Sequence, residues 1–105
     1  MASKLEFAQY IADQLRDAGE IKIRKMFGEY GLYCNGKYVA CICDDQFFIK
    51  ITKPGKELCP DLPEAPPYDG AKNCFLIENV DDREMLTALV AATCDALPEP
   101  KKRGS

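Results

Sequence analysis

The chain has 105 residues, of which 47% are hydrophobic and 30% charged, and its formal net charge is −3. This length suits one domain with one core, and the composition is that of an ordinary folded protein rather than a disordered chain. The roughly 20 apolar residues of a membrane span and the residue order of a secretory signal are both missing, so we expect a cytoplasmic protein without membrane contact.

Three of the 14 basic residues lie together in the C-terminal tail. Without the three cations of the tail, Lys101, Lys102 and Arg103, the net charge falls from −3 to −6. Such a body repels a phosphate backbone unless its remaining basic side chains gather on one face. The charge balance therefore argues against a tight, independent nucleic-acid binder.

The first predicted element is an amphipathic helix. Ser3 and Glu6 have the spacing of a capping box, in which each side chain satisfies a backbone donor of the other residue. Apolar residues then recur at helical spacing as far as Ala18, and Gly19 is a typical C-terminal stop. We expect a helix of about four turns that packs through one face.

Four extended segments with short turns between them follow, and they predict an antiparallel meander. The predicted strands are 21–27, 30–34, 37–43 and 46–52, and the predicted turns are Gly28-Glu29, Asn35-Gly36 and Asp44-Asp45. Asn-Gly between strands is the strongest local hairpin signal, because both central positions of a type I′ turn need positive φ.

Turn lengths also predict the register of the strands. Two-residue turns place Ile42 opposite Phe47, Ala40 opposite Ile49 and Tyr38 opposite Ile51, with Tyr33 beside Tyr38 on the same face. The other face then holds Leu32, Val39, Cys41, Cys43, Phe48 and Lys50. Both faces are largely apolar, so either helices cover both, or one is buried against another subunit. We favour partial covering together with a homodimer.

The second half of the chain predicts fewer regular elements. Residues 53–60 have room for at most a turn or two of helix between prolines, and residues 61–70 form a proline-rich surface loop. A fifth strand is predicted at 73–78. Asp81 and Glu84 then resemble a second capping box at the start of a helix. The apolar stripe of this helix is formed by Leu86, Leu89, Val90, Thr93 and Leu97. Residues 1–97 are thus one domain, and 98–105 a basic, solvated tail.

No residue pattern predicts catalysis. The chain has no histidine, and its adjacent aspartates lie where turn and cap chemistry explains them. The glycines match no phosphate-binding or dinucleotide-binding motif, so neither an enzyme nor a cofactor is expected. The chain has six cysteines, but no two of them have the Cys-x-x-Cys spacing typical of zinc ligands, so no metal site is expected. Cys41 and Cys43 point the same way, but are too far apart for an unstrained bridge; we interpret the cysteines as small, mostly buried hydrophobes.

A candidate binding surface lies along the first hairpin and the following turn. It combines basic and aromatic residues, namely Arg24, Lys25, Phe27, Tyr30 and Lys37. Such a combination can hold a nucleic acid through phosphate contacts and base stacking. Alternatively, the cations are solvated residues that protect a sheet edge and the aromatics belong to the core.

Two segments of the chain resemble a known protein family. Met26 to Tyr33 reads Met-Phe-Gly-Glu-Tyr-Gly-Leu-Tyr, and Asp44 to Lys50 reads Asp-Asp-Gln-Phe-Phe-Ile-Lys. Together with Asn35-Gly36-Lys37 and the Pro-Pro-Tyr loop at 66–68, these segments resemble the TfoX N-terminal domain family (TfoX/Sxy) over residues 3–97. Glu29 stands where the family usually has a second glycine.

The resemblance implies an α+β fold with an N-terminal helix, an antiparallel meander sheet of about five strands and a C-terminal helix, similar to secretion-chaperone-like and YjbR-like folds. It implies a bacterial, non-enzymatic domain for the regulation of competence and transcription, corresponding to the first domain of the two-domain regulators. We expect it to act through a protein partner or as a homodimer. The alternatives are weak direct nucleic-acid binding through Arg24, Lys25, Lys37 and the tail, or a cysteine-based sensor.

Overall fold

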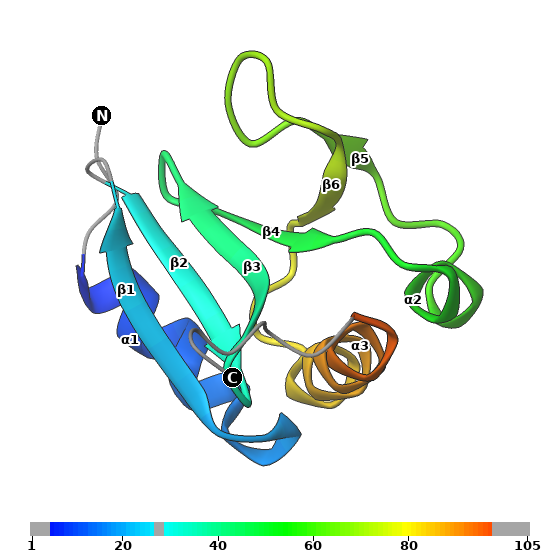
Figure 1. Cartoon of the computed structure of the whole chain (residues 1–105), viewed down its shortest axis with the longest axis horizontal. Coiled ribbons are helices and arrows are strands. Elements are labelled where there is room, and N and C mark those ends of the chain that lie inside the picture. The colour runs from blue at the N-terminus through cyan, green and yellow to red at the C-terminus, as the bar shows by residue number, and fades with distance from the viewer. Residues whose placement is uncertain (1–4, 27–28, 98–105) are drawn as a thin grey trace, which may run out of the picture.

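A computed structural model describes residues 5–26 and 29–97 and confirms the predicted α+β class. One antiparallel sheet of six strands packs against three α-helices (Figure 1). The helices are α1 (Leu5–Gln14), α2 (Lys53–Leu58) and α3 (Arg83–Ala96), with a short 3₁₀ turn at Arg16–Ala18. The strands are β1 (Ile21–Met26), β2 (Glu29–Cys34), β3 (Lys37–Cys43), β4 (Gln46–Lys50), β5 (Glu64–Ala65) and β6 (Cys74–Ile77). None of these helices is long and apolar enough to cross a membrane.

The sheet has the strand order β1-β2-β3-β4-β6-β5. Its first four strands are the predicted meander, and β6 is the predicted fifth strand. The short strand β5 was not expected, because its two residues lie in the proline-rich segment. Glu64 and Ala65 pair with β6, and the Leu76 N–H donates to the Pro63 carbonyl at 2.8 Å. These bonds satisfy backbone groups on an edge of β6 that would otherwise be unpaired.

The two later turns of the meander have the predicted geometry. Asn35 and Gly36 have φ values of 53° and 83°, and Asp44 and Asp45 have φ values of 52° and 56°. Positive φ at both central positions is the mark of a type I′ hairpin, which matches the twist of the strands.

The first turn differs from the prediction. Glu29 pairs with Met26 and is the first residue of β2, so Gly28-Glu29 is not the turn. The Glu29 carboxylate also accepts a hydrogen bond from the Asp44 N–H at 2.5 Å, which ties the start of β2 to the β3–β4 turn. The connecting residues, 27–28, lie outside the described part of the chain.

A β-bulge changes the predicted division of side chains between the two faces. Tyr33 pairs with Tyr38, but Leu32 pairs with Ala40, so Val39 is an extra residue in β3. The bulge places Leu32 and Val39 in the main core, where both are fully buried. Tyr38 instead packs on the opposite face, contrary to the simple two-residue alternation. The pairs Ile42 with Phe47 and Ala40 with Ile49 are as predicted.

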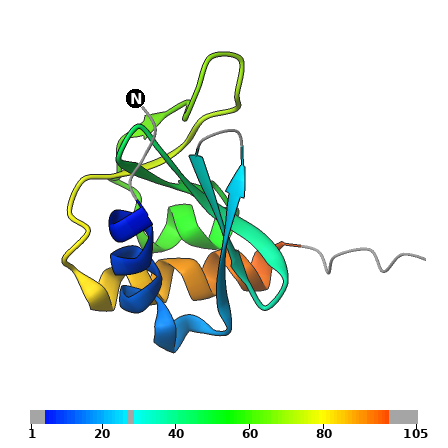
Figure 2. The ribbon, with the colours of Figure 1, turned by 90° about the vertical axis from the view of Figure 1, so that its left-hand side faces the viewer.

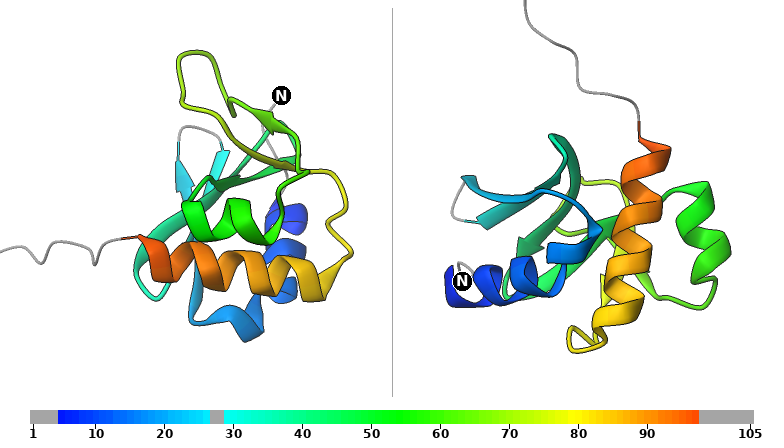
Figure 3. Two further views of the ribbon diagram at one scale, coloured as in Figure 1. Left: turned by 90° about the vertical axis from the view of Figure 1, so that its right-hand side faces the viewer. Right: turned by 90° about the horizontal axis from the view of Figure 1, so that it is seen from below.

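All three helices lie on one face of the sheet, called here the inner face (Figures 2 and 3). The main core fills the space between them and the sheet. Its largest fully buried side chains come from the sheet, from α1 and the residue after it, and from α3, and include Phe47, Phe75, Ile11, Leu15, Leu32, Ile42, Ile49, Leu86 and Leu89. Burial of each such side chain contributes about 1.5–3 kcal/mol, so this face carries most of the folding energy.

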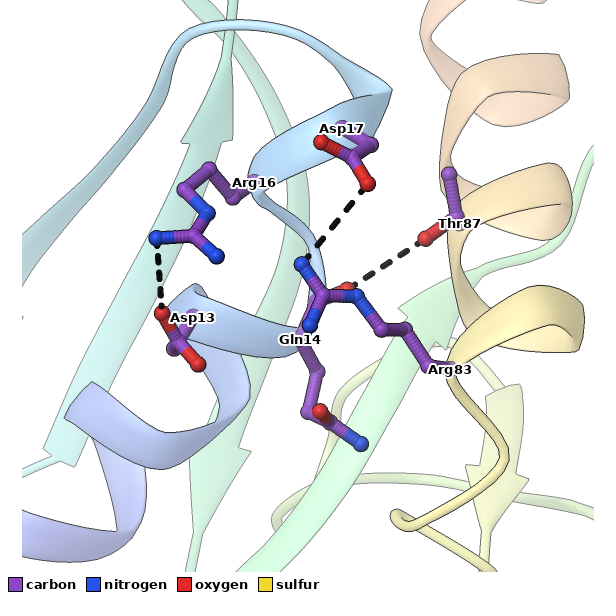
Figure 4. Close-up of polar contacts among 6 residues, drawn as sticks. All are labelled: Asp13, Gln14, Arg16, Asp17, Arg83 and Thr87. Atoms are coloured by element: carbon purple, nitrogen blue, oxygen red, sulfur yellow. Dashed lines mark hydrogen bonds and ion pairs between the residues drawn. The ribbon is translucent and has the colours of Figure 1, made fainter.

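The first helix is shorter than predicted. Regular α-helix ends at Gln14, and the last predicted turn is the 3₁₀ segment. Contacts with α3 account for this end: the Thr87 hydroxyl donates to the Gln14 carbonyl at 3.3 Å, and Arg83 pairs with Asp17 at 3.6 Å (Figure 4). The Gln14 side-chain amide donates to the Val80 carbonyl at 3.0 Å. The predicted Ser3 cap lies outside the described residues.

The N-cap of the third helix lies one residue later than predicted. Asp82, rather than Asp81, is the N-cap, and its carboxylate accepts a hydrogen bond from the Met85 N–H at 3.2 Å. Asp81 instead accepts a hydrogen bond from the Tyr10 hydroxyl, which joins α1 to the start of α3. The predicted apolar stripe is confirmed, because four of its five members are fully buried and Leu97 packs against them.

The second helix, α2, is held close to α3 by a glycine. Thr52 caps α2 by accepting from the Gly55 N–H at 3.2 Å. A Cβ atom at Gly55 would lie 3.0 Å from the Thr52 hydroxyl oxygen and 3.2 Å from Leu89 Cδ1. A side chain at this position would therefore press on Thr52 and Leu89 at the close approach of α2 to α3.

We expect Gly55→Val to lower the free energy of unfolding by about 1–3 kcal/mol, because its side chain overpacks the contact with Leu89. Urea denaturation followed by circular dichroism measures this change. Glu57→Val places the same side chain on the exposed side of α2 and is the matched control, with a change of about 0.5 kcal/mol. Equal losses in the two variants would contradict the packing argument.

Candidate functional site

The face of the sheet opposite the helices, called here the outer face, carries a second apolar cluster. Cys41, Cys43 and Phe48 are buried there, each 7% exposed or less. Partly buried neighbours pack around them, namely Tyr38, Ala65, Cys74 and Leu76. None of the described helices covers this face, and the connection from β5 to β6 projects beyond the sheet as a long loop (Figures 1 and 2).

Two neighbouring cavities lie between the outer face and this loop. They have volumes of about 340 Å³ and about 580 Å³ and share three lining residues, Tyr38, Pro67 and Tyr68. We call them together the outer groove. Tyr68 is 65% exposed, an unusual state for a large aromatic side chain. Concave, mainly apolar spaces of this size are typical of binding sites.

A row of cationic and aromatic side chains crosses four strands beside the groove. The Arg24 guanidinium lies 5.9 Å from the Tyr33 ring centre, and the Tyr33 and Tyr38 rings lie 5.3 Å apart at 42°. The Lys50 ammonium lies 4.8 Å from the Tyr38 ring centre. Each cation–π contact contributes about 0.5–1 kcal/mol at exposed sites, and together they fix the orientation of the tyrosines.

The two ends of the outer groove differ in charge. Lys50 and Lys72 line the smaller cavity, where no carboxylate is among the lining residues. Neither lysine forms an ion pair with any residue of the described chain. Glu29 and Asp44 line the larger cavity. The groove is therefore suited to a ligand with an apolar centre and a negative group at the Lys50 end.

Three thiols line the groove, and burial keeps them protonated at neutral pH. Burial raises the pKa of Cys41 to about 12, with a further contribution from the neighbouring Cys43 thiol. Burial also raises the pKa of Cys43 and of Cys74, although the Lys50 charge lowers that of Cys74. Because the thiolate is the reactive form, these thiols are weak nucleophiles.

The described residues of the sequence-predicted binding surface come together only in part, since Lys25 pairs with Tyr30 across β1 and β2 while Arg24 and Lys37 lie elsewhere. Arg24 is on the outer face, whereas the adjacent Lys25 is on the inner-face side of the same edge strand. Tyr30 is only 9% exposed, packs in the main core and borders the larger cavity. Phe27 lies outside the described residues. Lys37 turns toward the end of α3, where its ammonium donates to the Cys94 carbonyl at 2.9 Å.

Several groove residues were absent from the predicted surface. Four of them come from three different segments of the chain, namely Tyr38, Lys50, Tyr68 and Lys72. They lie together only because the tertiary fold brings β3, β4 and the β5–β6 loop side by side. The sequence did contain a signal for Lys50, which alternation placed on one face with Cys41. Pro-Pro-Tyr at 66–68 was recognised as a loop, but its position over the sheet depends on the pairing of β5 with β6.

The polar and apolar groups of the groove are arranged in a way that can bind a ligand. Within the described chain, no group of three metal-ligating side chains comes together. The groove has no histidine, since the chain has none. Besides its thiols, its polar groups are two lysines, three tyrosine hydroxyls, the Asn73 amide and two carboxylates, which can hold a partner by charge and hydrogen bonds.

Comparison with known proteins identifies a family and a relative. The model of a family described as the TfoX N-terminal domain matches residues 13–97. An uncharacterized 12.7 kDa protein in the trpE 5′ region of Spirochaeta aurantia is 33% identical over 104 residues, which cover 98% of this chain and 90% of that protein. The match to the family model includes the sheet, α2, α3 and every described lining residue of the groove.

We expect Lys37→Met to lower the free energy of unfolding by about 1–2 kcal/mol, because it removes a charged donor from the last turn of α3. Lys22→Met changes an exposed cation on β1 and is the control, with a change within about 0.5 kcal/mol. Chemical denaturation of both variants measures the difference. A stable Lys37→Met variant would show that this cation has no structural role.

Alkaline pH should destabilise the protein through Cys41. Its pKa in the folded chain is about 12, above the ordinary value of 9.0, so the folded state retains a proton that the unfolded state loses. The contribution of the Cys41 thiol to the free energy of unfolding is fully present below pH 9 and is lost as the pH rises toward 12. Denaturation at pH 7.5 and pH 10 should show a smaller alkaline loss for Cys41→Ala than for the unmodified chain. An unchanged loss would contradict the burial argument.

Proposed function

The chain belongs to the TfoX N-terminal domain family, and we propose that it is a non-enzymatic regulatory domain that binds a protein partner in the outer groove. The family suggests a regulatory role. The observation that carries the proposal is a second apolar face, not covered by any described helix, beside the exposed aromatic ring of Tyr68. Concave, mainly apolar spaces lined by aromatic side chains are common binding sites, and the outer groove is of this kind.

The charge of the groove indicates the chemistry of the partner. Lys50 and Lys72 line one end, where no described carboxylate neutralises them. A partner segment with apolar side chains for the groove and an aspartate or glutamate for this end satisfies both features. Apolar contact with Tyr38 and Tyr68 supplies the affinity, since aromatic side chains at the centre of an interface commonly dominate its energy.

A protein partner fits the surface better than a nucleic acid does. The outer face holds Lys22, Arg24, Lys50 and Lys72, since Lys22 and Arg24 alternate along β1 with residues that face the core. The carboxylates of Glu29 and Asp44 line the same groove, while Lys25 lies on the other side of the sheet and Lys37 is bound to α3. A phosphate backbone on this face would therefore meet acidic groups as well as cations. We place this action in the cytoplasm, where the six free cysteines remain reduced, and we propose transcription or competence as the process regulated.

Site-specific photocrosslinking tests the proposal. We expect a benzophenone amino acid at Tyr68 to form one discrete protein adduct in the source cells, and the same group at Glu57 on α2 to form none. Lys50→Glu should weaken the Tyr68 adduct at least tenfold, because it reverses the charge at the basic end, whereas Lys53→Glu on α2 should not. Mass spectrometry identifies the partner and its contact segment.

The identity of the adduct decides between the alternatives. A distinct protein with an acidic, apolar contact segment supports the proposal. A second copy of this chain would replace the partner with a homodimer through the same groove, and light scattering would then give twice the mass of one chain. A nucleic-acid adduct, or equal adducts at positions 68 and 57, would overturn the proposal.

A further inference from the structure

Two thiols on the floor of the outer groove form a close pair. Cys41 and Cys43 are two residues apart on β3, and their sulfur atoms lie 4.0 Å from one another. Cys41 lines the smaller cavity and Cys43 the larger one. Each is 7% exposed or less, yet both border the space between the sheet and the projecting loop. The pair is thus screened from bulk water but adjacent to the groove.

The spacing of the pair does not suit a disulfide. Residues i and i+2 of a strand have Cα atoms about 6.6 Å apart. That separation is at the upper limit for disulfides, whose Cβ atoms must also approach to about 3.8 Å. The strand is held on both sides by β2 and β4, so its backbone is not free to bend. A direct S–S bond between Cys41 and Cys43 is therefore disfavoured.

The same spacing suits a single bridging ion. Metal–sulfur bonds of about 2.3 Å allow two sulfur atoms to lie at most about 4.6 Å apart, so the observed 4.0 Å is within reach of one ion. Two thiols without histidine or carboxylate ligands favour soft cations. Structural zinc requires four ligands, which this pair does not supply. We propose that Cys41 and Cys43 bind one soft monovalent cation of the copper(I) class.

The binding step is a proton exchange without a redox change. Two S–H bonds break, two metal–sulfur bonds form, and both protons pass to the solvent. The bound ion and two thiolates carry one net negative charge. Tyr38 and Lys50 line the same cavity as Cys41, and the Lys50 ammonium, 4.8 Å from the Tyr38 ring centre, offsets part of the added charge. These two groups belong to the same outer-face row described above.

Anaerobic titration of the reduced full-length chain with copper(I), in competition with bicinchoninate, tests the inference. We expect native mass spectrometry to find one ion per chain. Because two protons are released, the apparent affinity should rise about 100-fold per pH unit between pH 6 and pH 8. Cys41→Ser and Cys43→Ser should each reduce the affinity at least 100-fold, and Cys59→Ser, which changes a thiol outside the groove, should leave it unchanged.

Fragmentation of the unmodified chain provides a test that does not depend on the folding of variants. Top-down fragmentation of the copper-loaded chain in native mass spectrometry should locate the ion on fragments that contain Cys41 and Cys43, with none on fragments that contain only Cys59. Location of the ion at Cys34 and Cys94 instead would overturn the inference, as would a failure to compete with bicinchoninate. Formation of a Cys41–Cys43 disulfide on mild oxidation would also contradict it. The inference stands whether or not a protein partner is found.

Discussion

One extra residue in the third strand determines how this domain divides its side chains. Val39 interrupts the pairing of β2 with β3, so that Leu32 lies opposite Ala40 while Tyr33 still lies opposite Tyr38. Leu32 and Val39 consequently enter the core beneath the helices, and each contributes about 1.5–3 kcal/mol by burial. The two tyrosines are directed to the other side. Without the bulge, regular alternation would send Leu32 and Val39 to the face without helices and Tyr38 into the core.

This division gives the sheet two different faces. The inner face, covered by α1, α2 and α3, holds the main core. The outer face holds an ordered row of cations and aromatic rings, three thiols and a groove closed on one side by the β5–β6 loop. Most of the buried apolar contacts that stabilise the fold lie on the inner face. Side chains of the outer face that contact a partner can therefore change with little loss of folding free energy. That separation is consistent with a family whose members have regulatory roles.

Local chemistry allowed much of the fold to be predicted from the sequence. Asn35-Gly36 and Asp44-Asp45 identify their turns because few other residues accept positive φ. The apolar stripe of α3 follows from helical periodicity. The bulge at Val39 and the pairing of Glu64 with Phe75 depend on tertiary contacts, which leave no local pattern. For the same reason the groove was missed, since its lysines and tyrosines converge only after β4, β6 and the loop are in place.

The Val39 bulge places Tyr33 and Tyr38 on the outer face, where they join Cys41, Phe48 and Lys50. Nuclear Overhauser measurements on the labelled chain test this placement directly, because opposed Cα–H groups of antiparallel strands lie close together. The structure predicts backbone contacts between Leu32 and Ala40, together with ring contacts between Tyr33 and Tyr38. Backbone contacts between Leu32 and Val39, with Tyr38 protected in the core, would show a regular ladder instead. That result would contradict the assignment of the outer face and the groove built on it.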